Sequence, residues 1–507
     1  MLKFFSRNTS DHPFADLKMA RELLAGIASG DSLASIEDLI HWLQSIRGEA
    51  AFKADHRAQA LLMIDETAQI HVRRLARDYL GSTRLLKQQE MRLWNAVDSY
   101  LQEASISFAT TLEQLAADGR ATDATKSMLA LLAVRALRML ATQLKWMHLR
   151  YGPVETSLWS LVSRVYAVAE QNRISQMPVV VYSGASDEST MQRELLQLFM
   201  FAACSPGTLV PIEMELAERL IAHFAPKFAA ASASSTATPY WVDLGAAAAP
   251  RRGAVPVETV GPIGFFGAAS AYAGLLALAA EIRAAGAMPS QVNLGGTYEI
   301  ERVLAVLDHL EQHWSPKLPE RKYIRQSAKL RLTVTRGFDG VIDVLQLPVG
   351  EVPASEEIES WIMEDISAGG FGALVPSIKQ DWLHIGCLLG LHYEGSSHWS
   401  VGIVRRLARS AGQQANVGIQ VLSRAAVPVE LRIKTEYGLS LDSEIGVLLP
   451  ASRTDEELRL LLRPGVYDAG QMFKIEREGG DRLLVPARAV ERGNDYELLA
   501  VRESRRS

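Results

Sequence analysis

The sequence predicts an α+β protein of several domains: an all-helical N-terminal region, a mixed and mainly helical middle region, a small β-barrel, and a further small β-rich module. Three observations predict this order. Apolar residues recur every three and four positions up to about residue 175, small residues and prolines interrupt that pattern between residues 226 and 318, and beyond them apolar and polar residues alternate.

Residues 1–175 are predicted to form a helical bundle. The helical period is clear in one group of apolar residues, Ile36, Leu39, Ile40 and Leu43. Asp31 and Asp123 precede helical segments and suit the N-cap position, because their carboxylates can accept hydrogen bonds from the first free backbone N–H groups. A second group is expected in the core, where it fills gaps between helices: Met139, Trp146 and Met147.

Residues 176–318 form the mixed middle region. It holds a short strand-like run, MPVVVY, and helices are predicted at residues 188–204, 211–223 and 297–314. The run AAASASSTATP consists of small residues and predicts a linker near residues 226–260. Between Glu258 and Glu281 no residue is charged, which satisfies the length of a membrane span. Glycines and a proline make that stretch weakly hydrophobic, so we expect a core helix and no stable membrane insertion.

Residues 319–425 and 426–507 are predicted to be rich in β-strands. LRLTVT, WSVGI and VGIQV alternate apolar and polar side chains, with glycine-containing turns between them. Short alternating strands joined by turns are typical of a small closed barrel. Six further runs follow, from VELRIK to DYELLAV, and predict either an extension of that barrel or a second module.

The composition limits the kinds of partner. The 507 residues carry a formal net charge of −5. Such a chain has no global positive field, so we expect no nucleic-acid partner, and any anion site has to be local. The two cysteines, Cys204 and Cys387, lie in apolar surroundings and predict buried thiols in a reducing compartment. No secretory signal is visible, so the predicted location is the cytoplasm.

Two short motifs in the β-rich part carry the functional prediction. They are RKYIR at residues 321–325 and DISAGG at residues 365–370. Each alone has an ordinary structural explanation, the arginines as a solvated basic arm and the second motif as a turn capped by its own side chains. Their order, and the strands that follow them, favour a joint function.

With these motifs in this order, and with HWSVGIVRRLAR and NVGIQVLS after them, residues 319–424 resemble the PilZ family of cyclic di-GMP receptors. The resemblance implies a six-stranded type of β-barrel, with cyclic di-GMP as the ligand and no other cofactor. It also implies that five residues bind this ligand: Arg321, Arg325, Asp365, Ser367 and Gly370. The gap between the motifs is long for the family, and VGEVPASEEIES is the predicted loop insertion.

These residue types suit a cyclic dinucleotide, which offers two phosphodiester charges and two guanine bases. An arginine guanidinium binds phosphate oxygens or guanine O6 and N7 as a fork, and its plane stacks on a purine. Asp365 is an acceptor matched to the N–H donors on the Watson–Crick edge of guanine. Ser367 adds a hydroxyl, and Gly369 and Gly370 let the backbone approach the ligand without a Cβ in the way.

The predicted function is that of a non-enzymatic cyclic di-GMP effector. Binding at the barrel would be coupled to the helical region, which would serve as the output part and dock a protein partner. The alternative is a PilZ-type interaction scaffold that binds no ligand. A third interpretation, an enzyme in the helical or middle part, ranks last. Its one mixed α/β feature is MPVVVYSGAS, and no nucleophile, base and oxyanion donors can be assembled there.

Two further groups of residues have structural interpretations. His309 and His313 have the spacing of metal ligands on a helix, but no other ligand accompanies them, so a solvated helix face is predicted. Arg405, Arg406 and Arg409 are predicted to form a solvated strand edge that resists pairing, rather than a second anion site.

Overall fold

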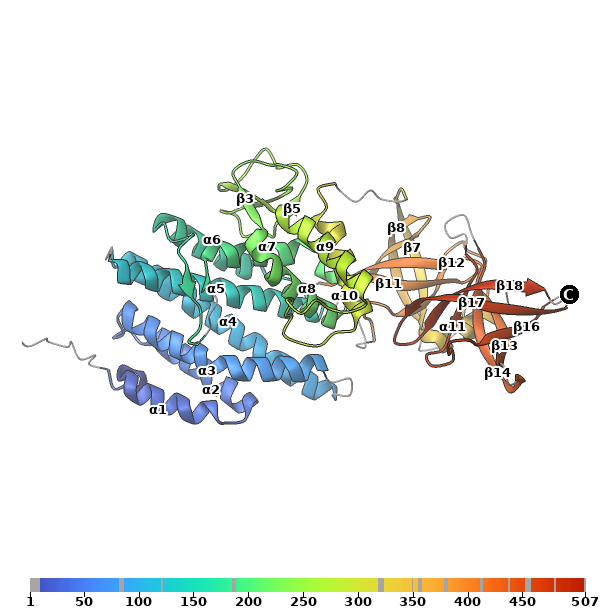
Figure 1. Ribbon diagram of the computed structural model, residues 1–507, viewed down its shortest axis with the longest axis horizontal. Coiled ribbons are helices and arrows are strands. Elements are labelled where there is room, and N and C mark those ends of the chain that lie inside the picture. The colour runs from blue at the N-terminus through green and yellow to red at the C-terminus, as the bar shows by residue number, and fades with distance from the viewer. Residues whose placement is uncertain are drawn as a thin grey trace, which may run out of the picture. The chain divides into compact units, whose positions relative to one another are not determined.

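The computed structural model describes residues 10–81, 86–119, 122–184, 188–317, 323–348, 350–353, 358–377, 382–410, 414–435, 438–451, 457–477 and 480–505. Packing divides the chain into two compact units. The first unit comprises Met1–Arg150, Val154–Pro206 and Pro211–Pro319, and the second comprises Tyr151–Pro153, Gly207–Val210 and Glu320–Ser507. In Figure 1 the first unit runs from blue to yellow-green and holds long helices, and the second runs from yellow to red and holds the β-barrels. The predicted α+β class, helices first and barrels second, is confirmed.

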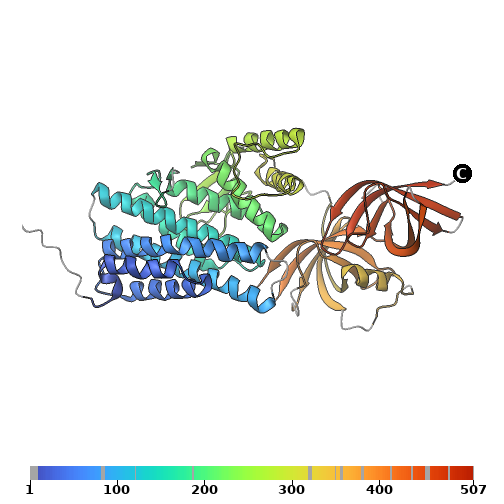
Figure 2. The ribbon, with the colours of Figure 1, turned by 60° about the horizontal axis from the view of Figure 1, so that its bottom comes forward.

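The N-terminal part of the first unit is a bundle of long helices that lie side by side in both views (Figures 1 and 2). A short 3₁₀ turn, Pro13–Ala15, precedes six helices, α1 (Leu17–Ala28), α2 (Ser32–Gly48), α3 (Ala54–Gly81), α4 (Lys87–Ala117), α5 (Asp123–Leu149) and α6 (Thr156–Gln171). Asp31 is the N-cap of α2, as predicted, and its carboxylate accepts from the N–H groups of Leu33 and Ala34. The cap of α5 is Thr122, one residue before the predicted Asp123.

Helix α5 is the central helix of this bundle. Met139, Trp146 and Met147 are buried on it, which confirms their predicted place in the core. In the part of the chain that the structure describes, it is the one helix long and apolar enough to cross a membrane. About 67% of its most apolar window is buried within the protein, and it also carries the buried ion pair of Arg135 with Asp65, 3.1 Å apart. Its apolar surface therefore contacts other helices of the bundle.

The rest of the first unit combines helices with short strands. The helices are α7 (Met191–Ala203), α8 (Pro211–Phe224), α9 (Ser270–Ala285) and α10 (Ile300–Trp314), with 3₁₀ turns at Pro206–Thr208 and Ala225–Lys227. Strands β1 (Val179–Val180) and β2 (Glu188–Ser189) pair with each other. A four-stranded sheet in the order β3-β6-β4-β5 is formed by β3 (Ala229–Ala231), β4 (Tyr240–Asp243), β5 (Arg251–Arg252) and β6 (Ile263–Gly267).

Two sequence-based expectations need correction in this region. Strands β3, β4 and β5 occupy residues for which composition indicated a linker: β3 and β4 pair with the two sides of β6, and β5 pairs with β4. The helix face of His309 and His313 is half-buried rather than solvated. The imidazole Nε2 of His309 lies 2.6 Å from the carbonyl oxygen of Cys204, and burial lowers the pKa of His313 to about 4.

The second unit contains two closed antiparallel barrels. The first barrel has the strand order β10-β11-β12-β9-β8-β7, and its strands are β7 (Gln326–Arg336), β8 (Glu359–Ser367), β9 (Gly370–Val375), β10 (Leu388–Tyr393), β11 (Ser400–Arg409) and β12 (Ala415–Ser423). The second has the order β13-β14-β15-β18-β17-β16, and its strands are β13 (Val427–Thr435), β14 (Gly438–Leu449), β15 (Arg459–Leu462), β16 (Met472–Arg477), β17 (Gly480–Arg492) and β18 (Glu497–Arg505). The C-terminal residues therefore form a second barrel and do not extend the first.

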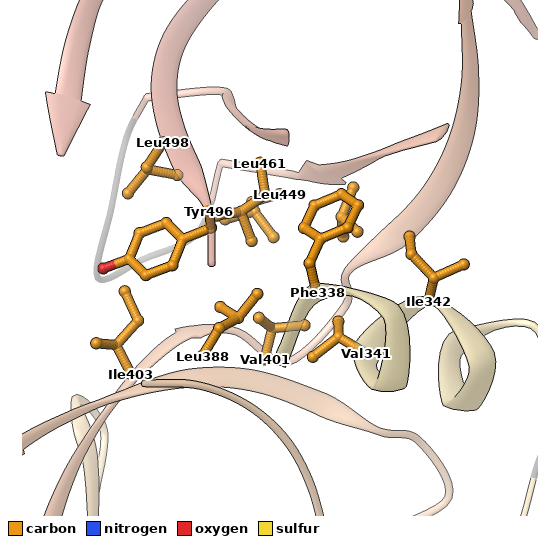
Figure 3. Close-up of a cluster of buried hydrophobic side chains, with 11 residues drawn as sticks. Phe338, Val341, Ile342, Leu388, Val401, Ile403, Leu449, Leu461, Tyr496 and Leu498 are labelled. Atoms are coloured by element: carbon orange, nitrogen blue, oxygen red, sulfur yellow. The ribbon is translucent and has the colours of Figure 1, made fainter. Parts of the chain in front are cut away.

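A helix that the sequence analysis did not predict, α11 (Gly337–Leu345), follows β7 and helps to join the two barrels. Figure 3 shows its side chains Phe338, Val341 and Ile342 beside residues of both barrels. The first barrel contributes Leu388, Val401 and Ile403, and the second contributes Val447, Leu449, Leu461, Tyr496 and Leu498. Burying each large apolar side chain contributes about 1.5 to 3 kcal/mol, so this seam fixes one barrel against the other.

Candidate ligand-binding site

A cavity of about 540 Å³ opens on the wall of the first barrel. It is lined by residues just before β7, by the β8–β9 hairpin, and by stretches of β12, which pairs with β9, and of β11, which pairs with β12. Its volume lies in the range of about 300 to 1,000 Å³ that is typical of small-molecule sites. The hairpin carries the DISAGG motif, and the residues before β7 include the end of the RKYIR motif.

Arg325 and Asp365 meet at this cavity. Their atoms Nη1 and Oδ2 are 3.2 Å apart, and the side chains are 45% and 31% exposed. Asp365 lies over Gly372 on the neighbouring strand, where an added Cβ would come within 2.6 Å of Oδ2. The other oxygen, Oδ1, is buried and accepts no hydrogen bond from the described residues. One carboxylate oxygen is thus paired with a cation, and the second is an unused acceptor.

The hairpin turn brings Ser367 and two glycines to the same cavity. The Ser367 hydroxyl donates to the carbonyl oxygen of Gly370 at 3.2 Å, so it caps the turn. An added Cβ on Gly369 would lie 2.7 Å from the ring of Tyr323. An added Cβ on Gly370 would lie 2.0 Å from the carbonyl oxygen of Ile419 on β12. Glycine is required at Gly370 because a backbone carbonyl approaches it this closely, whereas at Gly369 the approaching group is a side chain.

Four of the five site residues implied by the resemblance therefore line one cavity: Arg325, Asp365, Ser367 and Gly370. The fifth, Arg321, lies outside the described residues.

The chain matches two family models. One is described as the N-terminal domain of the cyclic-di-GMP receptor FimW and matches residues 18–233. The other is described as the middle PilZ domain of the same receptor and matches residues 353–428. The chain contains a PilZ domain. Among curated proteins, none matches this sequence.

The two matches correspond to recognisable parts of the fold. The PilZ match covers strands β8 to β12, so strand β7 and the RKYIR motif lie on its N-terminal side. The first match covers α1 to α8, a region for which the sequence analysis recognised no family. The helical part is therefore a known kind of domain as well.

Strand β11 of the PilZ barrel supplies residues that the sequence analysis did not assign to the site. Arg405 and Arg406 on β11 line the cavity. The pairing of β11 with β10 ends at Ile403, and beyond it β11 pairs with β12 alone, so the two arginines stand on a stretch that is paired on one side and also lines the cavity. The second barrel contributes Arg459. The arginine cluster on β11 was visible in the sequence, but its place at the site depends on the pairing of β11 with β12 and of β12 with β9.

Aromatic residues frame the hairpin of the PilZ barrel. Phe371 is buried beneath the guanidinium of Arg424, whose Cζ is 5.1 Å from the ring centroid. Arg424 also donates from Nη2 to the carbonyl oxygen of Ser367 at 3.1 Å. Tyr323 could have been singled out from the sequence, because it stands between the two arginines of RKYIR. These contacts hold the hairpin in place beside the cavity.

Among the residues that the structure describes, no group of three or more histidines, cysteines and acidic residues gathers. Burial raises the pKa values of Cys204 and Cys387 to about 12 each. Both thiols therefore stay protonated at neutral pH, as expected for buried apolar cysteines.

Proposed function

We propose that the protein is a cyclic di-GMP effector whose ligand binds in the cavity of the PilZ barrel. The observation that carries the proposal is the convergence of Arg325, Asp365 and the DISAGG hairpin on one cavity. The names of the two matching families, both domains of a cyclic-di-GMP receptor, support it independently. The expected role is binding without catalysis, so the ligand leaves unchanged.

The chemistry of the cavity fits a dianionic ligand with guanine bases. Four arginines and two carboxylates line it among the described residues, which leaves an excess of positive charge. Arg325 would turn from Asp365 to a phosphate oxygen or to guanine O6 and N7. Asp365 Oδ1, buried and unused, would accept from the N–H donors of a guanine. Adenine has no N1–H donor, so this contact would favour guanine.

The remaining motif residues would act close to the backbone. Ser367 would redirect its hydroxyl from the Gly370 carbonyl to the ligand. Gly369 would let the flat ring of Tyr323 lie against the hairpin, where a base can stack on an aromatic face. Arg321, four positions before Arg325, would supply a second guanidinium to the same ligand.

Coupling to the helical part would use the covalent connection between the two regions. Helix α10 ends at Trp314, and only a short segment separates it from Arg325. A ligand that fixes both arginines of the motif would restrict this segment. A differential affinity of a few kcal/mol between open and closed arrangements is enough to shift such an equilibrium. A protein partner of the helical region would then respond to the ligand.

Isothermal titration of the full chain tests the binding step. Cyclic di-GMP is expected to bind, and cyclic di-AMP is expected to bind more weakly because it lacks the guanine donors that Asp365 accepts. A normally folded chain that shows neither heat of binding nor a ligand-dependent shift in unfolding temperature would contradict the proposal and support the alternative of a scaffold without ligand.

A further inference from the structure

Strand β11 contains a β-bulge at the cavity. Its pairing with β12 is regular from Gly402 opposite Val421 to Val404 opposite Ile419 and resumes with Arg406 opposite Gly418, which leaves Arg405 as the extra residue. In a regular strand, neighbouring side chains point to opposite faces of the sheet. A bulge changes this alternation and re-aims a side chain. Here it brings both Arg405 and Arg406 to the lining of the same cavity.

The guanidinium of Arg405 is held in place from two sides. Its Nε donates to Gln420 Oε1 at 2.8 Å, and its Nη1 and Nη2 donate to the two carboxylate oxygens of Glu491 on β17 at 2.6 and 2.5 Å. The hydroxyl of Tyr496 donates to the same carboxylate at 2.7 Å. Three of the five N–H donors of Arg405 are therefore used, and two remain in a fixed orientation. The second barrel thus positions a residue of the cavity in the first.

Arg406 differs from its neighbour. It is exposed, and no ion pair or hydrogen bond of its side chain occurs in the described part of the chain. Gly418 lies opposite it, and an added Cβ there would come within 3.1 Å of the Cβ of Arg406. Because Gly418 has no side chain, the space beside Arg406 stays open. An uncompensated cation next to two fixed N–H donors is a suitable arrangement for a phosphate oxygen pair.

We propose that Arg405 and Arg406 form a second anion subsite, which binds a phosphodiester group on the β11 side of the cavity. The register places Arg406 in one row with Asp365 across the sheet, with Gly372 and Gly418 between them. This inference rests on the proposed function, because the phosphodiester belongs to cyclic di-GMP. The group has two sources: the second phosphodiester of the molecule that Arg325 binds, or a phosphodiester of a second molecule. In either case Arg406 supplies the free charge and Arg405 supplies preorganised donors.

Titration of the full chain with cyclic di-GMP tests the subsite with three variants. Arg406→Ala is expected to weaken binding by roughly tenfold or more, or to remove one of two binding equivalents, because a charged hydrogen bond is lost. Arg406→Lys keeps the charge and is expected to retain part of the affinity. Arg331→Ala is the matched control, since Arg331 is an exposed arginine of the same barrel that bonds Ser360 and does not line the cavity.

The outcomes separate the alternatives. Equal stoichiometry with lower affinity in Arg406→Ala identifies one ligand molecule that spans the cavity, and a fall from two equivalents to one identifies a second molecule. Wild-type binding that is unchanged in both Arg406 variants overturns the subsite and leaves the proposed function standing. A wild type that does not bind overturns both. Without ligand, the Arg406 variants and the wild type are expected to have equal unfolding temperatures, because the Arg406 side chain has no partner to lose among the described residues. Should Arg406→Ala unfold, Arg406→Gln replaces it.

Discussion

We expect the substitution Arg325→Ala to weaken the binding of cyclic di-GMP while leaving the fold intact. The only ion pair of Arg325 in the described residues is the one with Asp365, at 3.2 Å, and both side chains are well exposed. Such a pair contributes about 0 to 1 kcal/mol to stability. For a unit of this size, 1 kcal/mol corresponds to roughly 2 to 4 °C in the unfolding temperature. The variant should therefore melt within about 4 °C of the wild type.

The effect on the ligand is expected to be larger. Each hydrogen bond between a guanidinium and an anion contributes about 1.5 to 3 kcal/mol, and about 1.4 kcal/mol is a factor of ten in affinity. The variant also leaves the charge of Asp365 unopposed next to an anionic ligand. Affinity should thus fall roughly ten- to hundredfold. Calorimetric titration measures this loss, with Arg331→Ala as the control that removes an arginine charge elsewhere on the barrel. Equal affinities of Arg325→Ala and wild type would refute the assignment of Arg325 to the site.

Two further substitutions test the framework around the cavity. Gly370→Ala places a Cβ 2.0 Å from the carbonyl oxygen of Ile419, so β12 has to shift. Thermal unfolding should show a loss of about 1 to 3 kcal/mol in the free energy of unfolding. An unchanged unfolding temperature would mean that the hairpin is not packed this closely. Burial tends to raise the pKa of Glu491, but the hydrogen bonds and charge of Arg405 outweigh it and lower the pKa below its ordinary value of 4.5. The stability from this pair is therefore present above about pH 4.5 and lost as the pH falls through the lowered pKa. Denaturant unfolding should show Glu491→Gln to be less stable than the wild type by about 1 to 3 kcal/mol at pH 7. This difference in stability should shrink toward pH 3. A difference that stays constant with pH would argue against an ionic pair.

Three strands of the PilZ barrel, β7, β11 and β12, could be predicted because their pattern is local. Val401 and Ile403 alternate with small or polar neighbours on β11, and Val417, Ile419 and Val421 do the same on β12. The DISAGG and RKYIR motifs were informative for a similar reason. Each consists of residues close together in sequence, and their convergence follows from the pairing of β7 with β8.

Helix α11 could not be predicted from its own residues. Its sequence GFDGVIDVL contains two glycines and β-branched side chains, which disfavour helices. The helix forms because Phe338, Val341 and Ile342 are buried at the seam between the barrels. Tertiary packing, which lies outside the local sequence, overrides propensity here.

The β11 side of the cavity was missed because it depends on a bulge and on distant residues. A regular alternation would separate Arg405 from Arg406, and nothing in the sequence marks the extra residue. Glu491 lies 86 positions after Arg405 and on the other barrel. Charge pairing across such a distance in the chain is set by the closed topology of both barrels.

The structure of the full chain in complex with cyclic di-GMP tests the central claim most directly. The account predicts that the nucleotide lies in the cavity, with the Arg325 guanidinium at hydrogen-bonding distance, about 3 Å, from the ligand and the Asp365 carboxylate on a guanine edge. A nucleotide bound anywhere else on the protein, with Arg325 still paired to Asp365, would contradict it.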